Sequence, residues 1–234
     1  MIKTLKALYR SQLLTFSGIW HLLNSIRIDD MNLMTLLYVR QKLSPQQTAI
    51  SEDYYNIDYR TLYTQSQHLA DQLNTHCAIK PHQKIAVMAT NQPILVHIIF
   101  ALAALGADIY LLKTELSAKQ LQNINDNLQL DWIIHDSEIN TLPAVKTLPI
   151  HHYNQTSVQS LLNASIPSDS VKRKVTHCSK LTVLTSGTTG CFKMAGRSSK
   201  VQNFISPFYQ LLVKLNLSHC QKYTLPHRST MALV

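Results

Sequence analysis

Glycine is scarce in this chain. It occurs five times in 234 residues, whereas average usage near 7% would give about sixteen. Charged residues are also few, at 15% against about 25% in an average globular protein. The hydrophobic share of 45% excludes a mainly disordered chain, because that much apolar surface supports a buried core. The length suits one large domain or two small ones.

Cysteine and long apolar runs are equally limited. The four cysteines form no Cys-x-x-Cys pair, and no histidine stands near them at metal-site spacing. We therefore expect reduced thiols in a cytoplasmic protein and no bound structural metal. No apolar run reaches the ~20 residues of a membrane-crossing helix, and no secretory cleavage signal is recognisable. The cysteines are Cys77, Cys178, Cys191 and Cys220.

Acidic residues are outnumbered, which gives a net charge of +9. The basic residues are spread widely, and the densest run, 172–174, lies in a polar stretch with no nucleic-acid-binding motif beside it. We therefore expect no nucleic-acid partner. Residues 1–28 carry apolar side chains near helical spacing with Lys and Arg among them. The segment 1–32 is thus predicted to be a basic amphipathic helix, either packed on the domain or in peripheral contact with a membrane.

From residue 33 to 135, helix-like and strand-like patterns alternate. Alternation at these lengths predicts βαβ units, and hence an α/β fold with a parallel sheet covered on both faces. On the apolar helix, His97 is expected to be a core histidine. The predicted helices are 33–43, 59–73, 92–105 and 117–128, and the predicted strands are 48–50, 84–89, 107–112 and 131–135.

The stretch 136–179 is weaker in pattern. Its prolines and clustered Ser, Thr and Asn predict loop structure with one short helix. Regularity returns at Leu181–Leu184, which is predicted to be a strand, and Val201–Leu217 is predicted to be a helix.

The strand at 181–184 runs directly into a segment that can carry chemistry. Six consecutive residues, 185–190, are hydroxylic or glycine, and a lysine follows three positions later. Glycines let backbone N–H groups approach an anion, hydroxyls add donors, and lysine adds a point charge suited to phosphate. The segment therefore predicts a polyphosphate cradle, with a ligand-free hairpin as the alternative. The candidate residues are Thr185, Ser186, Gly187, Thr188, Thr189, Gly190 and Lys193.

The cradle does not have the spacing of a Walker A loop or of a dinucleotide-binding fingerprint. Instead, TSGTTGxxK after an apolar strand resembles the phosphate-loop signature of the adenylate-forming enzymes, which include acyl-CoA synthetases and peptide-synthetase adenylation domains. Residues 49–112, with the turn Asn91-Gln92-Pro93, resemble the N-terminal subdomain of that family, and the likeness extends over about 33–217. One departure is Phe192, where the family usually has proline before the loop lysine.

The resemblance implies the parallel-sheet βαβ layers of the large N-terminal domain of such enzymes, here truncated. It implies ATP-dependent activation of a small-molecule carboxylic acid to an acyl-adenylate, followed by transfer to a thiol. ATP, Mg²⁺ and CoA are the implied cofactors, with a fatty or aryl acid as substrate and a carrier-protein thiol as the alternative acceptor. The seven residues of the cradle are the implied nucleotide contacts. The sequence identifies no catalytic residue.

Members of the adenylate-forming family are about twice as long as this chain. We therefore expect 33–221 to be a partial AMP-binding domain within an inactive or incomplete fragment. A shifted reading frame across Met231–Ala232 forces a glycine and permits a string like the family's next motif, so 222–234 is interpreted as an out-of-frame tail. The other interpretations are a non-catalytic nucleotide-binding protein and a membrane-surface protein that retains the fold.

Overall fold

The computed structural model describes residues 32–51, 56–136, 145–152, 154–164, 177, 179–186 and 192–197. These residues divide into two compact units, 32–64 and 65–197. The predicted segments 1–28, 201–217 and 222–234 lie outside the described residues, so the division of the chain into 1–32, 33–221 and 222–234 stays a prediction.

The first unit begins with helix α3 (Leu33–Leu43). Asn32 and Thr35 form a reciprocal capping box at its start, which satisfies backbone N–H groups that the helix itself leaves unpaired. Strands β1 (Thr48–Ser51) and β2 (Asn56–Asp58) then pair antiparallel. Asp58 accepts a hydrogen bond from the backbone N–H of Thr61 at 2.7 Å, in the first turn of α4 (Tyr59–Cys77). That bond holds the pKa of Asp58 below its ordinary value.

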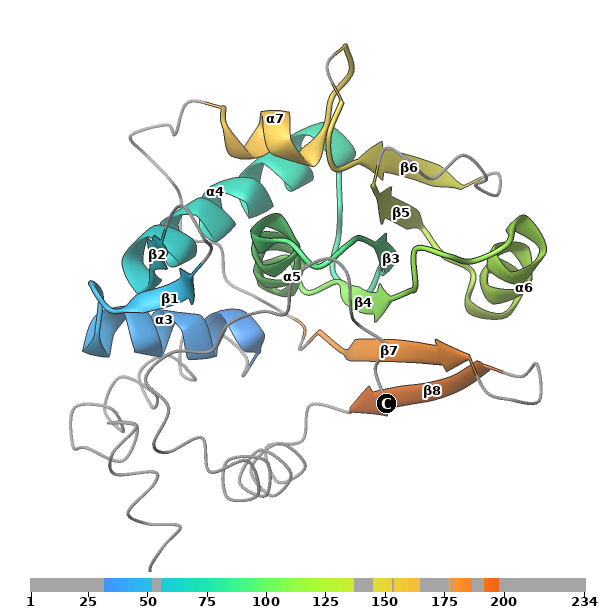
Figure 1. The fold of residues 1–234 in the computed structure, drawn as a ribbon, viewed down its shortest axis with the longest axis horizontal. Coiled ribbons are helices and arrows are strands. Elements are labelled where there is room, and N and C mark those ends of the chain that lie inside the picture. Colours follow the sequence, from blue (N-terminus) through green and yellow to red (C-terminus); the bar gives the residue numbers. More distant parts are fainter. Residues whose placement is uncertain are drawn as a thin grey trace, which may run out of the picture. The chain divides into compact units, whose positions relative to one another are not determined.

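The second unit is built on a six-stranded sheet with the order β6-β5-β3-β4-β7-β8 (Figure 1). The first five strands in that order run parallel, and β8 runs antiparallel to β7 at the edge. The predicted α/β fold with a parallel sheet is therefore confirmed. The strands are β3 (Lys84–Met88), β4 (Asp108–Leu111), β5 (Trp132–His135), β6 (Lys146–Pro149), β7 (Leu181–Ser186) and β8 (Phe192–Arg197).

Two helices cover opposite faces of this sheet, α5 (Pro93–Ala104) and α6 (Ala118–Leu128) (Figure 1). Leu121 and Ile124 of α6 pack in one buried cluster with sheet residues that include Met88 and Leu184. Strand alternation turns the intervening residues, such as the fully buried Ile85, toward the other face. Both faces of the sheet therefore contribute to the core.

Local signals explain where these helices begin and end. Ser117 and Gln120 form a capping box before α6, and Pro93 starts α5 at a position where a missing N–H costs nothing. After α5, Gly106 has φ +73°, and a Cβ there would meet the carbonyl oxygen of His177 at 3.2 Å. Glycine is required at this turn for both reasons.

The stretch 136–179 is where the sequence prediction needs correction. The predicted short helix is present as α7 (Val158–Leu162), but residues 146–149, which the sequence predicts to be loop, form the paired parallel strand β6. Its Pro149 fits because β6 lies at the edge of the sheet, where a strand tolerates a residue without an N–H. Strand β8 was also missed. The other predicted helices and strands between 33 and 184 are present within a few residues of the expected bounds.

Candidate functional site

The predicted cradle begins at the end of β7 and reaches its last residue, Lys193, in the paired strand β8. Thr185 stands opposite Lys193 and Ser186 opposite Phe192 in the antiparallel register of β7 and β8. Two predicted site positions eight residues apart in sequence are therefore brought face to face along the backbone. The remaining predicted contacts, Gly187, Thr188, Thr189 and Gly190, lie outside the described residues. The ladder resumes at Phe192, so the position where the family usually has proline here begins a strand.

Strand β7, which leads to the cradle, is hydrogen-bonded to a neighbouring strand on each side. β7 pairs with β4 on one side and with β8 on the other. Thr182 and Leu184 are buried, and Leu184 belongs to the cluster beneath α6. Because β7 runs parallel to β4, its end at Ser186 lies at the carboxyl edge of the sheet, which is where open α/β sheets bind ligands.

At a second place on the same edge, the protein's own groups are hydrogen-bonded to one another. Chain connections leave β3 and β5 in opposite directions along the sheet, so the crevice typical of such folds falls between their carboxyl ends. There the Asp136 carboxylate accepts hydrogen bonds from the Thr90 N–H at 2.7 Å and from Gln92 Nε2 at 2.9 Å. Gln92 Oε1 in turn lies 3.2 Å from His151 Nε2. The groups at this point are therefore hydrogen-bonded to one another, whereas the β7–β8 end carries the predicted phosphate contacts and is the candidate ligand site.

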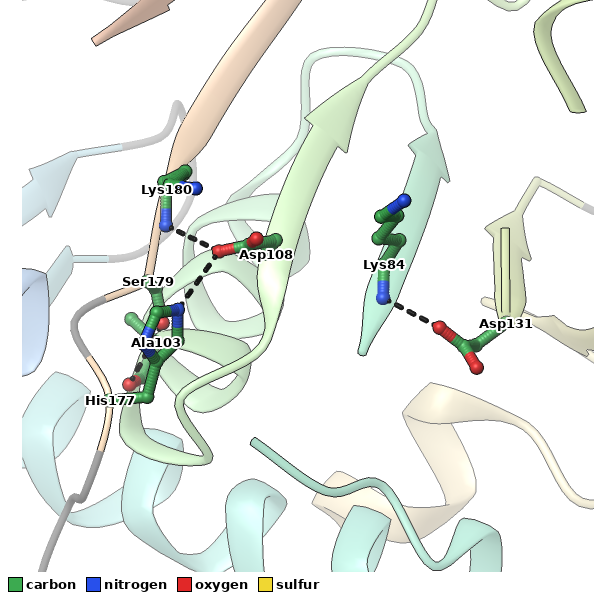
Figure 2. Close-up of polar contacts among 7 residues, drawn as sticks. All are labelled: Lys84, Ala103, Asp108, Asp131, His177, Ser179 and Lys180. Carbon is green, nitrogen blue, oxygen red and sulfur yellow. Dashed lines mark hydrogen bonds and ion pairs between the residues drawn. The ribbon is translucent and has the colours of Figure 1, made fainter. Parts of the chain in front are cut away.

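The opposite, amino-terminal edge holds polar groups that sequence reasoning did not single out (Figure 2). Asp108, buried at the start of β4, accepts a hydrogen bond from the backbone N–H of Lys180, and Asp131 accepts one from that of Lys84. Burial, and secondly the charge of Asp108, raise the pKa of Tyr110. The only sequence signal for these carboxylates is an aspartate directly before or at the start of an apolar strand.

Other reactive side chains in the described residues have structural surroundings. His97 is buried, with Nδ1 3.1 Å from the Pro93 carbonyl and Nε2 2.9 Å from Gln65 Oε1, and burial lowers its pKa. Its predicted role as a core histidine is confirmed. Cys77 is buried, which raises the pKa of its thiol and leaves it a poor nucleophile.

Two searches of the described residues gave negative results. They contain no group of three or more His, Cys, Asp or Glu side chains arranged to hold a metal ion. Among the same residues, no helix is both long and apolar enough to cross a membrane.

Comparison with known proteins places this chain in a family. A model of the AMP-binding enzyme family matches residues 38–224. A 2-succinylbenzoate–CoA ligase from Bacillus cereus is 28% identical over 155 residues, which are 66% of this chain and 30% of that enzyme. The chain therefore spans about a third of the length of that curated relative.

Solved structures share the fold. The o-succinylbenzoate CoA synthetase MenE from Bacillus subtilis, in complex with ATP and magnesium ion, superimposes with a TM-score of 0.59 at 19% identity, covering 79% of this chain and 47% of that one. The N-terminal subdomain of Klebsiella oxytoca NpsA, in complex with 3-hydroxybenzoyl-AMSN, gives a TM-score of 0.58 at 20% identity, with coverages of 70% and 40%. With its family model matching most of the sequence, the chain belongs to the AMP-binding enzyme family.

Proposed function

We propose that the turn between β7 and β8 holds the triphosphate of ATP. The observation that carries this proposal is the register that sets Thr185 opposite Lys193 at the carboxyl edge of the sheet, with glycine and hydroxylic residues between them in sequence. Backbone N–H groups freed by glycine, hydroxyl donors and one lysine charge together suit an oxyanion-rich ligand. The proposed contacts are Thr185, Ser186, Gly187, Thr188, Thr189, Gly190 and Lys193.

The donor set of this segment fits a magnesium ion that arrives with the nucleotide. No carboxylate occurs between Leu181 and Arg197, so hydroxyl groups are the oxygen ligands that the side chains of this segment offer. Mg²⁺ at nucleotide sites keeps several waters and takes much of its coordination from phosphate oxygens. Thr185 and Ser186 are the described positions closest to the turn that would supply a hydroxyl ligand. When bound, the ion neutralises charge on the phosphates.

We propose further that this nucleotide serves the activation of an aromatic carboxylic acid. In that reaction a carboxylate oxygen attacks the α-phosphorus of ATP, the bond to pyrophosphate breaks, and an acyl-adenylate forms. A thiol then attacks the acyl carbon and AMP leaves. The names of the relatives favour an aryl acid. The Bacillus relative is a 2-succinylbenzoate–CoA ligase, and NpsA is in complex with a ligand that contains a hydroxybenzoyl group. They give no support to the fatty acid that the family resemblance suggested as one substrate.

The thiol acceptor has two candidates. CoA is favoured by the ligase relatives, whose names include it. A carrier-protein thiol is favoured by NpsA, which has also been solved as an artificial fusion of adenylation and PCP domains. Because the chain spans 30% of the relative's length, the full two-step reaction is a proposal, and nucleotide binding without turnover is its alternative.

Binding of MgATP by the full 234-residue chain is the first test. We expect Lys193→Ala to raise the Kd for MgATP by about tenfold, the effect of losing roughly 1.4 kcal/mol, as measured by isothermal titration calorimetry. Lys119→Ala removes the same charge from an exposed position on α6 and should leave the Kd unchanged. Absence of MgATP binding by the unmodified chain, or equal effects of both substitutions, would refute the assignment.

Carboxylate-dependent exchange of pyrophosphate into ATP tests the chemistry. Exchange stimulated by 2-succinylbenzoate or 3-hydroxybenzoate but not by palmitate supports aryl-acid activation. Exchange with palmitate alone would reverse the substrate assignment. MgATP binding with no exchange from any acid would favour the nucleotide-binding alternative. Product formation with CoA, or with a carrier protein in its place, separates the two acceptors.

A further inference from the structure

The start of β7 is bound to β4 through a side chain as well as the backbone. Oδ1 of Asp108, whose side chain is 11% exposed, accepts a hydrogen bond from the Lys180 N–H at 3.0 Å. The backbone N–H of Ile109 donates to the Lys180 carbonyl at 2.7 Å. Both backbone groups of Lys180 are therefore engaged with β4 immediately before β7 begins.

A second aspartate carboxylate in the sheet accepts from the backbone N–H of a lysine in the neighbouring chain segment, as Figure 2 shows. Asp131, just before β5, accepts from the Lys84 N–H at 2.8 Å and donates its own N–H to the Lys84 carbonyl at 2.9 Å. In each case an aspartate at the start of one strand fixes the first residues of the parallel neighbour. The two cases differ in burial, because Asp108 is buried and Asp131 is exposed.

Two residues shortly before β7 make further contacts. Nε2 of His177 lies 3.3 Å from the same Oδ1 of Asp108, and its ring packs against that of His82, with 3.7 Å between centroids and 32° between the ring planes. Ser179 Oγ donates to the Ala103 carbonyl at 3.4 Å. The residues entering β7 are thus held at the turn between α5 and β4, with Asp108 accepting from two of them.

Register matters at this strand because of what stands at its other end. A slip of one residue along a parallel neighbour moves a strand by about 3.3 Å and turns its side chains to the opposite face. Such a slip would remove Leu184 from the cluster beneath α6 and displace Thr185 and the turn that follows. A phosphate cradle depends on donors held within fractions of an ångström.

We propose that Asp108 is a positioning residue for nucleotide binding: its carboxylate sets the register of β7 from the amino-terminal edge and thereby fixes the cradle at the carboxyl edge. Asp131 has the corresponding role for β3, which does not lead to the cradle. The inference rests on the proposed nucleotide function. It adds to that function a residue of β4 that lies beside the start of β7, at the opposite edge of the sheet from the cradle, and does not contact the ligand.

The test compares variants of the full chain by amide hydrogen exchange and by MgATP titration, each at a temperature that gives equal fractions folded. Asp108→Ala should speed exchange in 180–184 and raise the Kd for MgATP by about tenfold. Asp108→Asn keeps an acceptor oxygen and should restore most of the affinity. Asp131→Ala should speed exchange in 84–88 and leave the Kd unchanged.

A second variant approaches the same bond from the donor side. Lys180→Pro removes the N–H that Asp108 accepts and should weaken MgATP binding to a similar extent, even if Asp108→Ala fails to fold. Unchanged affinity in both Asp108→Ala and Lys180→Pro, or equal losses in Asp131→Ala, would overturn the positioning role. If the unmodified chain binds no MgATP, the proposed function fails, and exchange in 180–184 alone decides whether Asp108 holds β7.

Discussion

The two helices that cover the sheet differ in what holds them in place. In α5 the only polar residue is His97, and even that side chain is buried. In α6 most residues are polar, and only Leu121 and Ile124 are buried. α6 also has a capping box, whereas α5 has no side-chain cap. The comparison teaches that α6 is specified by local signals and one apolar stripe, while α5 depends on being enclosed by the core.

Replacing one buried leucine on each helix by alanine should give the largest difference in the free energy of unfolding between the two faces of the sheet. Leu102 of α5 and Leu121 of α6 are both fully buried, and Leu→Ala changes cost about 2–5 kcal/mol depending on how far the cavity collapses. We expect Leu102→Ala to fall near the upper end. Leu121→Ala should fall near the lower end, because half-buried neighbours such as Leu116 and Leu128 can move inward. Urea unfolding measures both, and an equal or larger loss at Leu121 would contradict the comparison.

Substitutions in the turns that end the two helices should change the free energy of unfolding in opposite directions. Gly106 after α5 and Gln129 after α6 both have left-handed backbone, with φ +73° and +55°. Gly106→Ala should lose about 1–2 kcal/mol from backbone strain alone, with a further loss from contact with His177. Gln129→Gly should gain a few tenths of a kcal/mol, because glycine adopts this conformation without strain. Thermal unfolding measures the two signs, and destabilisation by both would show that the Gln129 side chain matters more than its backbone.

Acid should lower the free energy of unfolding through the buried histidine of α5. Burial lowers the pKa of His97, so the folded state favours neutral imidazole while the unfolded chain takes up a proton near pH 6.5. The stability from His97 is therefore complete above pH 6.5 and is lost as pH falls toward the lowered pKa, by at most about 1.4 kcal/mol per pH unit. His97→Gln should remove this dependence between pH 7.5 and 5.5 in urea unfolding. Leu121→Ala, as the control, should keep it.

Most of the sheet could be predicted because its elements are locally consistent. The strands at 84–88 and 108–111 and the helix at 118–128 combine the right periodicity with clear caps and turns. β6 could not be recognised, since it has one buried residue, Leu148, and ends at a proline. What makes it a strand is pairing with β5, which is a property of the assembled sheet. β8 likewise becomes a strand through its pairing with β7.

The candidate site divides in the same way. The run 185–190 and Lys193 could be singled out because their chemistry is contiguous in sequence. Asp108, Asp131 and Asp136 could not be, because each acts on a backbone or side-chain group 44 or more residues away in sequence. Only folding brings such partners within hydrogen-bonding distance.

By itself the sequence determined the order of helices and strands in the central βαβ units and the composition of the segment 185–193, which we propose to bind phosphate. Periodicity, capping residues and glycine act over a few positions and can be read directly. The tertiary structure decided the strand order, the hydrogen bond from Thr90 to Asp136 between the ends of β3 and β5, and the register that sets Thr185 opposite Lys193. These depend on hydrogen bonds between separate strands, whose partners no local pattern specifies.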